Sequence, residues 1–342
     1  MTTSQDQRQV VLVADSEYAA ACGELAGRFP QFDLRCPAED QAPATLATTQ
    51  VSALVAQDAH VDRDLLTALP GLRAVLNLGR NYANIDAAAV RERGIPFGAV
   101  PRKGPNCVAE LAMTLILALS KDLLISHRSV GEGAYRLRGL RPERSAQWKM
   151  AFHWMRHMRL HEVHGKVLGI VGMGEIGFEL ARRAVVMGMD VRYYKRRPLS
   201  PEVERATEVS YRPLSDLLRE SDYVCLAVPH TAETERMIGA AELELMRPEA
   251  YLVNICRGGV VDEEALIAAL SSGRLAGAGL DVFTYEPLPA DSPLCRLDNV
   301  ILTPHVGGGS GTTRPDELGV ALEELTAMLA GREPRINLGR AG

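Results

Sequence analysis

A strand-like run that leads into three closely spaced glycines constrains this chain more than any other feature. Residues 166–171 (KVLGIV) suit a buried strand, and Gly172, Gly174 and Gly177 follow at once. In this pattern the first glycine permits a tight turn, the second lets a pyrophosphate approach the backbone, and the third lets helix and strand pack closely. Three glycines alone can make an ordinary turn, but these flanks favour a dinucleotide site, with Glu175 and Ile176 also against the cofactor.

Short apolar runs alternate with amphipathic segments along the rest of the chain. Residues 175–187, 262–270 and 317–329 have apolar positions at helical spacing, and residues 111–119 predict a buried helix. Alternation of strand and helix predicts a parallel α/β fold. The expected strands are Val10–Ala14, Val51–Ala56, Ala74–Asn77, Val167–Val171, Val191–Tyr194, Tyr223–Val228, Tyr251–Ile255, Ala276–Leu280 and Val300–Thr303.

The length of 342 residues suits two domains, because single cores stop growing near 250 to 300 residues. A new mononucleotide-binding unit begins at Lys166, and we expect a dinucleotide-binding domain over residues 104–308. Residues 1–103 and 309–342 then form a discontinuous substrate-binding domain, since a last helix from about Thr313 would return to the N-terminal part. The expected architecture is two lobes, Rossmann-like or flavodoxin-like, with parallel sheets around a cleft.

The composition favours small-molecule chemistry. A net charge of −5 and a pI near 6.0 argue against nucleic-acid and membrane-surface partners, which require a basic field. The six cysteines form no CxxC pair and no zinc-like spacing, so we expect no metal and a reducing cytoplasm. Residues 1–7 are polar and predict no signal peptide.

Residues 126–165 depart from the α/β pattern. The segment is basic and contains Trp148 and Trp154, and on a continuous helix four of its histidines would line one face. A metal-dependent enzyme built on this segment is one interpretation. The favoured interpretation is an arm at the interface of a homodimer, where Trp, Met and Arg are enriched. The four histidines are His153, His157, His161 and His164.

The tip of the second strand after the glycines predicts which nicotinamide cofactor is bound. An acidic residue there would bond the 2′-hydroxyl of the adenosine ribose, but the chain has Lys195, Arg196 and Arg197. A cation about 4 Å from a 2′-phosphate gains on the order of 4 kcal/mol before desolvation. We therefore predict NADP(H), with NAD(H) as the alternative; the competing interpretation is three solvated cations in a turn.

Three later segments each follow an apolar strand and carry reactive side chains, namely Arg257, Asp281 with Glu286, and His305. Strand ends face the ligand crevice of an open α/β sheet. Reduction of a 2-oxo acid needs a cation for the carboxylate and a proton donor for the alkoxide, which suit Arg257 and His305, with Glu286 as partner of the histidine. Each residue alone has a structural explanation, but together they favour catalysis.

These segments resemble the D-isomer-specific 2-hydroxyacid dehydrogenase family. The resemblance runs from residues 79–86 (GRNYANID), through 108–110 (VAE) and the glycines, to 304–308 (PHVGG). It implies that Arg257 binds the substrate carboxylate and carbonyl, that His305 is the general acid/base and that Glu286 pairs with it. The cofactor contacts that it implies are Asp281 near the nicotinamide carboxamide, Val108 on the nicotinamide side, Pro229 and Thr234 on the adenosine side, and Cys256.

The same resemblance places the substrate carboxylate on backbone N–H groups around Gly79, in the segment Leu78, Gly79, Arg80 and Asn81. Ala83 stands where an aspartate is common in the family. Arg80, with Arg102 or Lys103, is an extra cation that would admit a second anionic group such as phosphate or phosphonate. The function expected is a reductase of small 2-oxo acids. The alternative is a corepressor-like protein that senses the cofactor on the same fold, and turnover of 2-oxo acids would decide between them.

Overall fold

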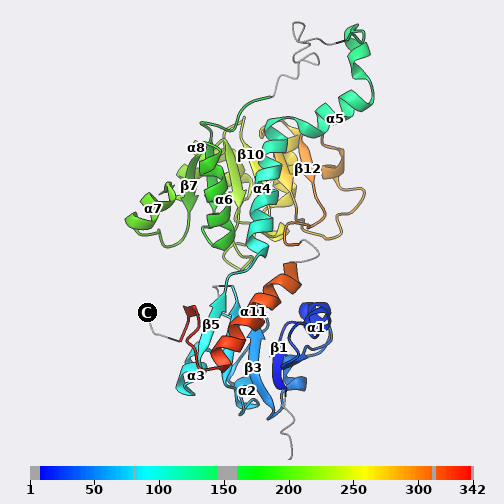
Figure 1. Ribbon diagram of the computed structural model, residues 1–342. Helices are drawn as coiled ribbons and strands as arrows, with labels where there is room; N and C mark the ends of the chain where they lie inside the picture. The colour runs from blue at the N-terminus through cyan, green and yellow to red at the C-terminus, as the bar shows by residue number, and fades with distance from the viewer. Residues whose placement is uncertain (1–7, 80–81, 145–159, 310–312, 340–342) are drawn as a thin grey trace, which may run out of the picture. The chain divides into compact units, whose positions relative to one another are not determined.

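The computed structural model of the chain describes residues 8–79, 82–144, 160–309 and 313–339. It divides into two compact units, Met1–Gly104 with Gly309–Gly342, and Pro105–Gly308, which we call unit 1 and unit 2 (Figure 1). Each unit is built on a predominantly parallel sheet with helices on both faces. The parallel α/β fold predicted from the alternation of strands and helices is therefore confirmed.

Unit 1 has a six-stranded sheet in the order β13-β5-β4-β3-β1-β2. The five parallel strands follow the flavodoxin-like order 2-1-3-4-5, and only the short edge strand β13 is antiparallel. The sequence predicted β1, β3 and β4 but missed the other three strands. The strands are β1 (Gln9–Val13), β2 (Phe32–Arg35), β3 (Val51–Ala56), β4 (Ala74–Leu78), β5 (Phe97–Val100) and β13 (Ile336–Asn337).

Two pairs of helices cover the sheet of unit 1. Helices α1 (Ala19–Leu25) and α11 (Thr313–Leu329) bury one face, and α2 (Arg63–Thr67) and α3 (Ala87–Glu92) bury the other. The C-terminal helix thus packs in the N-terminal part of the chain. Glu317 fixes it there, since this buried carboxylate accepts from the hydroxyl of Tyr18 at 2.9 Å and from the N–H of Gly104 at 2.9 Å.

Unit 2 has a seven-stranded, wholly parallel sheet in the order β12-β11-β10-β9-β6-β7-β8. This is the Rossmann order 3-2-1-4-5-6 with one strand added at the end. The strand order reverses between β6 and β9, and ligands bind such sheets at the carboxyl ends beside that point. The strands are β6 (Val167–Val171), β7 (Asp190–Tyr194), β8 (Val209–Tyr211), β9 (Tyr223–Leu226), β10 (Tyr251–Asn254), β11 (Gly277–Leu280) and β12 (Val300–Leu302).

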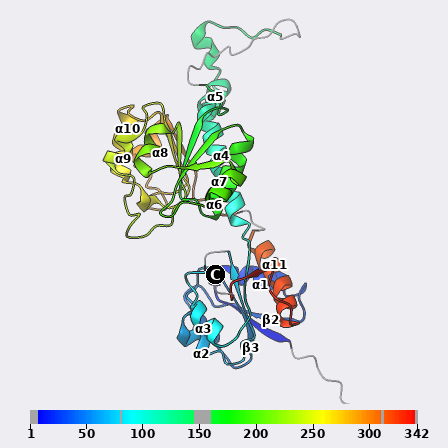
Figure 2. The same cartoon turned by 90° about the vertical axis from the view of Figure 1, so that its left-hand side faces the viewer.

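Helices form a layer on each side of this sheet (Figure 2). On one side lie α4 (Gly104–Ser120) and α6 (Glu175–Val186), and α7 (Pro201–Thr207) follows β7. The predicted buried helix 111–119 falls within α4, where Ile116 is fully buried. On the other side lie α8 (Leu214–Glu220), α9 (Ala240–Leu245) and α10 (Glu263–Ser271).

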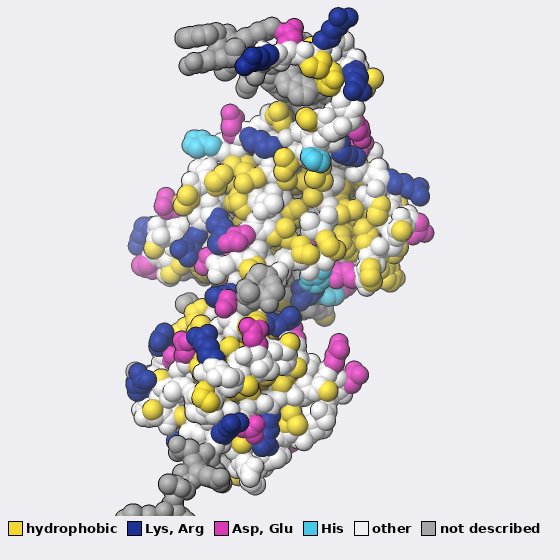
Figure 3. Space-filling view, turned by 45° about the vertical axis from the view of Figure 1, so that its right-hand side comes forward, with side chains coloured by type: hydrophobic (Ala, Val, Ile, Leu, Met, Phe, Trp, Pro, Cys, Tyr) yellow, Lys and Arg dark blue, Asp and Glu magenta, His cyan; other side chains and the backbone are white. Residues whose placement is uncertain are grey.

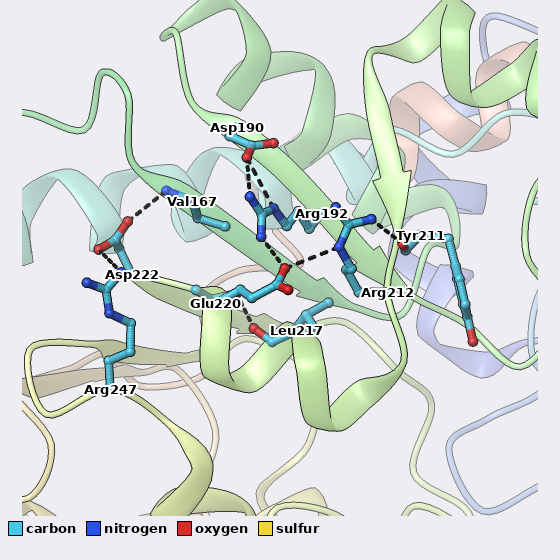
Figure 4. A network of polar contacts seen from close by, with 10 residues as sticks. Val167, Asp190, Arg192, Tyr211, Arg212, Leu217, Glu220, Asp222 and Arg247 are labelled. Atoms are coloured by element: carbon cyan, nitrogen blue, oxygen red, sulfur yellow. Dashed lines mark hydrogen bonds and ion pairs between the residues drawn. The ribbon is translucent and has the colours of Figure 1, made fainter.

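A charged network joins β6, β7 and the residue after β8 to the end of α8 and the residue before β9 (Figure 4). Glu220, the last residue of α8, pairs with Arg192 of β7 and with Arg212 after β8, the latter at 3.2 Å. Asp222 accepts at 2.8 Å from the N–H of Val167, which begins β6. These residues are not among those predicted for the site, and we assign the network to stability.

The segment after α4 contains α5 (Leu123–Gly131) and a 3₁₀ turn at Ala134–Arg138. His153 and His157 lie outside the described residues. Residues 160–165 form a loop, in which His161 contacts the hydroxyl of Tyr223 at 2.5 Å, so a helical face of histidines does not extend to this part. Within the described ranges, no three His, Cys, Asp or Glu side chains gather as a metal would require. Nor does any described helix combine the length and hydropathy needed to cross a membrane.

Candidate active site

The glycine loop after β6 has the geometry of a dinucleotide-binding turn. Gly172 has a φ of 106°, and a Cβ there would lie 2.4 Å from the carbonyl oxygen of Ala227. A Cβ at Gly177 would lie 2.3 Å from the carbonyl oxygen of Gly172, so only glycine lets α6 pack against the loop. At Gly174, by contrast, a Cβ would meet nothing within 4 Å. The space beside Gly174 is therefore open to a ligand that approaches the backbone.

Helix α6 directs its N-terminus toward this opening. It begins at Glu175, directly after Gly174, which occupies the N-cap position and has no side chain that could cap the helix. The N–H groups of a first helical turn have no partner within the helix, and the helix dipole adds positive potential. Gly174, Glu175 and Ile176 thus form a backbone cradle that fits the pyrophosphate of a dinucleotide.

The cationic turn predicted to read the ribose follows β7. The ammonium group of Lys195 donates to the carbonyl oxygen of Met173 at 3.3 Å, so this side chain lies against the glycine loop. Arg196 pairs with Glu233 at 3.2 Å, and both side chains are largely exposed. Arg197 is also exposed. The turn thus places cations beside the loop at the carboxyl edge of the sheet.

The loop after β9 closes on itself beside the glycine loop. Thr234 donates its hydroxyl hydrogen to the carbonyl oxygen of Pro229 at 2.6 Å and accepts from the N–H of Thr231 at 2.8 Å. Because β9 is the neighbour of β6, this loop flanks the glycines. Pro229 and Thr234, both predicted on the adenosine side, are therefore held together at the same edge.

The three candidate catalytic residues follow three neighbouring strands. Arg257 comes after β10, Glu286 after β11 and His305 after β12, so all three lie at the carboxyl edge. The Nδ1 atom of His305 lies 2.6 Å from Oε2 of Glu286. The other oxygen of Glu286 accepts from the N–H of Phe283 at 3.0 Å. The structure therefore forms a histidine–carboxylate pair that remains partly open to solvent.

The electrostatics of the pair favour a charged Glu286. Burial raises the pKa of this carboxyl, but the hydrogen bonds from His305 and Phe283 and the Coulomb interactions with His305 and Arg257 outweigh burial and lower it. Glu286 thus stays ionised at neutral pH. A fixed carboxylate can orient an imidazole and stabilise its protonated form.

Arg257 is exposed, and its loop packs tightly on the segment that leads to Glu286. Its guanidinium donates to the carbonyl oxygen of Cys256 at 2.6 Å. A Cβ at Gly258 would lie 1.9 Å from the carbonyl oxygen of Phe283. Glycine at 258 therefore allows the two loops to touch, a role that its place in the motif did not reveal.

Two predicted cofactor contacts face inward. The thiol of Cys256 is buried and donates to the Oδ1 atom of Asn254 at 3.1 Å; burial raises the pKa of this thiol to about 11. The backbone N–H of Cys256 donates to the same Asn254 oxygen. Asp281 is buried as well, and its carboxylate accepts hydrogen bonds from the loop that carries His305. Sequence reasoning missed Asn254 and Thr303, which hold these loops.

Val108 lies on α4, close to the loop that follows His305. A Cβ at Gly307 would come within 3.7 Å of Val108 and 3.3 Å of Leu111. Val108 therefore forms part of the wall behind that loop.

The predicted substrate segment belongs to unit 1. Leu78 ends β4 and is buried, and Gly79 follows with a φ of 100°. The N–H of Gly79 donates to the carbonyl oxygen of Val100 at 2.8 Å. Arg80 and Asn81 lie outside the described residues. Lys103, one of the cations considered for a second anionic group, pairs with Asp316 at 2.8 Å.

Comparison with known proteins gives one consistent result. A sequence profile described as "D-isomer specific 2-hydroxyacid dehydrogenase, NAD binding domain" matches residues 113–307. A glyoxylate reductase from Thermococcus gammatolerans is 40% identical over 80% of this chain and 78% of its own length. A glyoxylate/hydroxypyruvate reductase B from an Enterobacter species is 39% identical over 83% of each chain.

A solved structure is similar to this chain over almost its whole length. The crystal structure of an NADPH-dependent glyoxylate/hydroxypyruvate reductase from Sinorhizobium meliloti aligns with a TM-score of 0.70 and 26% identity over 97% of each chain. The profile covers more than half of this chain, and the two sequence relatives cover most of it. The chain belongs to the D-isomer specific 2-hydroxyacid dehydrogenase family and is an NAD(P)-dependent oxidoreductase that acts on 2-hydroxy or 2-oxo acids.

Proposed function

We propose that this enzyme reduces glyoxylate, hydroxypyruvate or a close 2-oxo acid with NADPH, and that Arg257, Glu286 and His305 are its catalytic residues. The observation that carries the proposal is the 2.6 Å contact of His305 with Glu286, beside the strand end that bears Arg257. The names of the relatives supply the two substrates.

The bound nicotinamide supplies or accepts the hydride. Arg257 pairs with the carboxylate of the substrate, for which its planar guanidinium provides two parallel donors. Since Nδ1 of His305 is held by Glu286, Nε2 is the atom left to donate a proton to the carbonyl oxygen as the alkoxide forms. In the oxidative direction the same nitrogen takes the proton back.

NADPH is the proposed cofactor because the three residues after β7 are cations, which would attract a 2′-phosphate. The relative from Sinorhizobium meliloti is NADPH-dependent by name. The ion pair between Arg196 and Glu233 is exposed, so a 2′-phosphate can compete for the arginine at little cost.

Substrate recognition by unit 1 is proposed for the segment from Leu78 to Asn81. The left-handed backbone at Gly79 turns the chain directly after β4. Arg80 is proposed to accept a second anionic group. An Arg80→Ala variant should then raise KM for a phosphorylated 2-oxo acid and leave KM for glyoxylate unchanged, whereas an unchanged KM for both would refute the role.

A panel assay tests the function as a whole. Oxidation of NADPH and of NADH is followed with glyoxylate, hydroxypyruvate and phosphorylated 2-oxo acids. We expect turnover with the first two and a preference for NADPH. Tight binding of cofactor without turnover of any 2-oxo acid would instead support a cofactor-sensing binding protein.

We also propose that the enzyme is a cytoplasmic homodimer joined through α5 and the 3₁₀ turn after it. Leu123, Leu124, Val130 and Leu137 are 53%, 46%, 58% and 91% exposed. Figure 3 shows hydrophobic side chains gathered over the visible face of unit 2. A second copy of this segment would cover such side chains. Sedimentation should give a dimer, and Leu137→Ser with Leu123→Ser should give a monomer; a monomeric wild-type protein would contradict this proposal.

A further inference from the structure

One buried carboxylate holds the loop that carries His305. Asp281 follows β11 and is 1% exposed. Its Oδ1 atom accepts from the hydroxyl of Thr303 at 2.6 Å and from the N–H of Val306 at 2.9 Å, and its Oδ2 atom accepts from the N–H of Gly307 at 2.9 Å. The N–H of His305 itself donates to the backbone carbonyl of Asp281 at 2.9 Å. Asp281 therefore binds the chain on both sides of the histidine.

The backbone of His305 needs such support. Its φ is 52°, in the left-handed region that residues with a Cβ seldom adopt. A residue in this region persists only where its surroundings fix it. The three donors to the carboxylate, at positions 303, 306 and 307, bracket the strained residue in the chain.

We propose that Asp281 is a positioning residue, which holds His305 in this conformation so that Nδ1 meets Glu286 and Nε2 faces the reacting carbonyl. The kinetic part of this inference rests on the proposed function. The alternative is the family-based expectation that Asp281 serves the nicotinamide carboxamide. A carboxylate has about four acceptor sites, of which the loop takes three, so the loop is the main partner of this side chain.

Two variants disturb the contact from opposite sides. Asp281→Asn keeps the shape, but its amide nitrogen must face either the donors at Oδ1 or the N–H of Gly307. Gly307→Ala leaves the charge in place, but its Cβ would lie 2.9 Å from the Oδ2 atom of Asp281 and push it away. Gly308→Ala is the matched control, because a Cβ there meets nothing within 4 Å.

Both variants should lower kcat at saturating NADPH on the order of 10- to 100-fold, because small displacements of an acid/base group cost rate of this size. The Kd for NADPH, measured by fluorescence titration, should stay within about 2-fold, as expected when no cofactor contact is removed. Gly308→Ala should match the wild type. Thr303→Val removes one of three donors, so its loss of kcat should be smaller and in the same direction.

A structural measurement separates this inference from the proposed function. In crystal structures, Asp281→Asn should move His305 to a negative φ and separate Nδ1 from Glu286. This result is expected even if the wild type turns over no 2-oxo acid, in which case only the proposed function fails. An unchanged His305 in the Asp281→Asn crystal would overturn the inference. A Kd for NADPH raised tenfold or more with kcat unchanged would overturn it too and assign Asp281 to the cofactor; if Asp281→Asn does not fold, Gly307→Ala carries the same test.

Discussion

His305 and Glu286 lie 19 positions apart in the sequence, yet Nδ1 of the histidine and Oε2 of the glutamate are 2.6 Å apart. The two residues follow neighbouring parallel strands, β12 and β11, so the sheet brings their loops to one edge. The backbone N–H of Phe283 holds the second carboxylate oxygen and fixes the direction from which Glu286 meets the ring. The pair is thus built from two loops, each anchored by its own strand.

Glu286→Gln should reduce kcat about 10- to 100-fold, because an amide can still accept from Nδ1 but no longer stabilises a protonated imidazole. KM for NADPH should change little. Steady-state kinetics checks both constants, with Glu263→Gln as the control, because the carboxylate of Glu263, at the start of α10, accepts from the N–H of Thr284 in the same segment. Wild-type kcat in Glu286→Gln would show that the contact has no catalytic role.

The same variant should change how stability depends on pH. The pKa of Glu286 is lowered in the fold, so its contribution is fully present above the ordinary carboxyl pKa of 4.5 and is lost as pH falls through the lower folded value. Wild type and Glu286→Gln should therefore differ in urea unfolding at pH 6 and converge in acid. The difference should be small, because the side chain is partly exposed. If the difference in unfolding free energy between the two proteins grew as the pH fell, the lowered pKa of Glu286 would be contradicted.

Arg257→Lys should lower kcat/KM for glyoxylate about 10- to 100-fold, because lysine cannot supply two parallel donors to a carboxylate. The loss should appear mainly in KM for the 2-oxo acid. Arg236→Lys, a charged residue paired with Asp262, is a control that should retain wild-type kinetics. If Arg257→Lys and the wild type had the same kcat/KM for glyoxylate, Arg257 would not bind the substrate carboxylate.

Replacing Arg196 and Arg197 together by alanine should raise KM for NADPH about tenfold or more and leave KM for NADH near its wild-type value. Glu233→Gln should act in the opposite direction, because it frees Arg196 from its partner. Initial rates with both cofactors, at low and high salt, measure these changes. If the wild type, the double alanine variant and Glu233→Gln all have the same KM for NADPH, the cations of this turn are solvated and do not contact the cofactor.

Two glycines of the cofactor loop should respond differently to alanine. Gly177→Ala should lower the melting temperature, since its Cβ would lie 2.3 Å from a backbone carbonyl oxygen. Gly174→Ala should fold normally, because its Cβ meets nothing within 4 Å, yet it should bind NADPH more weakly. Calorimetry and fluorescence titration test the pair. Tight cofactor binding by Gly174→Ala would mean that the pyrophosphate does not approach this backbone.

The sequence predicted the parts of the fold that have long apolar runs or strict glycine spacing. All strands of unit 2 except β8 were expected, with bounds that differ by a few residues at the ends. The strands that escaped prediction are short and at or near sheet edges: β8 has three residues, β13 has two, and β2 contains Asp33 and Arg35. Such strands depend on a neighbour for their structure, so local pattern cannot reveal them.

In the candidate site, too, some features could be predicted from the sequence and others could not. Motif order along neighbouring strands was enough to predict that Arg257, Glu286 and His305 share one edge, and the structure brings their loops together. The inward hydrogen bonds of Asp281 and the burial of the Cys256 thiol were not predicted. These two features depend on how loops that follow different strands pack against one another. Composition and motif spacing do not predict such packing.

The proposed mechanism depends on transfer of a proton by His305, and replacement of this residue examines that step alone. NADPH oxidation by glyoxylate is measured with the wild type and with His305→Gln, after NADPH binding has been shown to be equal in the two proteins. We expect turnover by the wild type and a kcat lower by on the order of 10²- to 10⁴-fold in the variant. A His305→Gln enzyme that reduces glyoxylate at the wild-type rate would contradict the account.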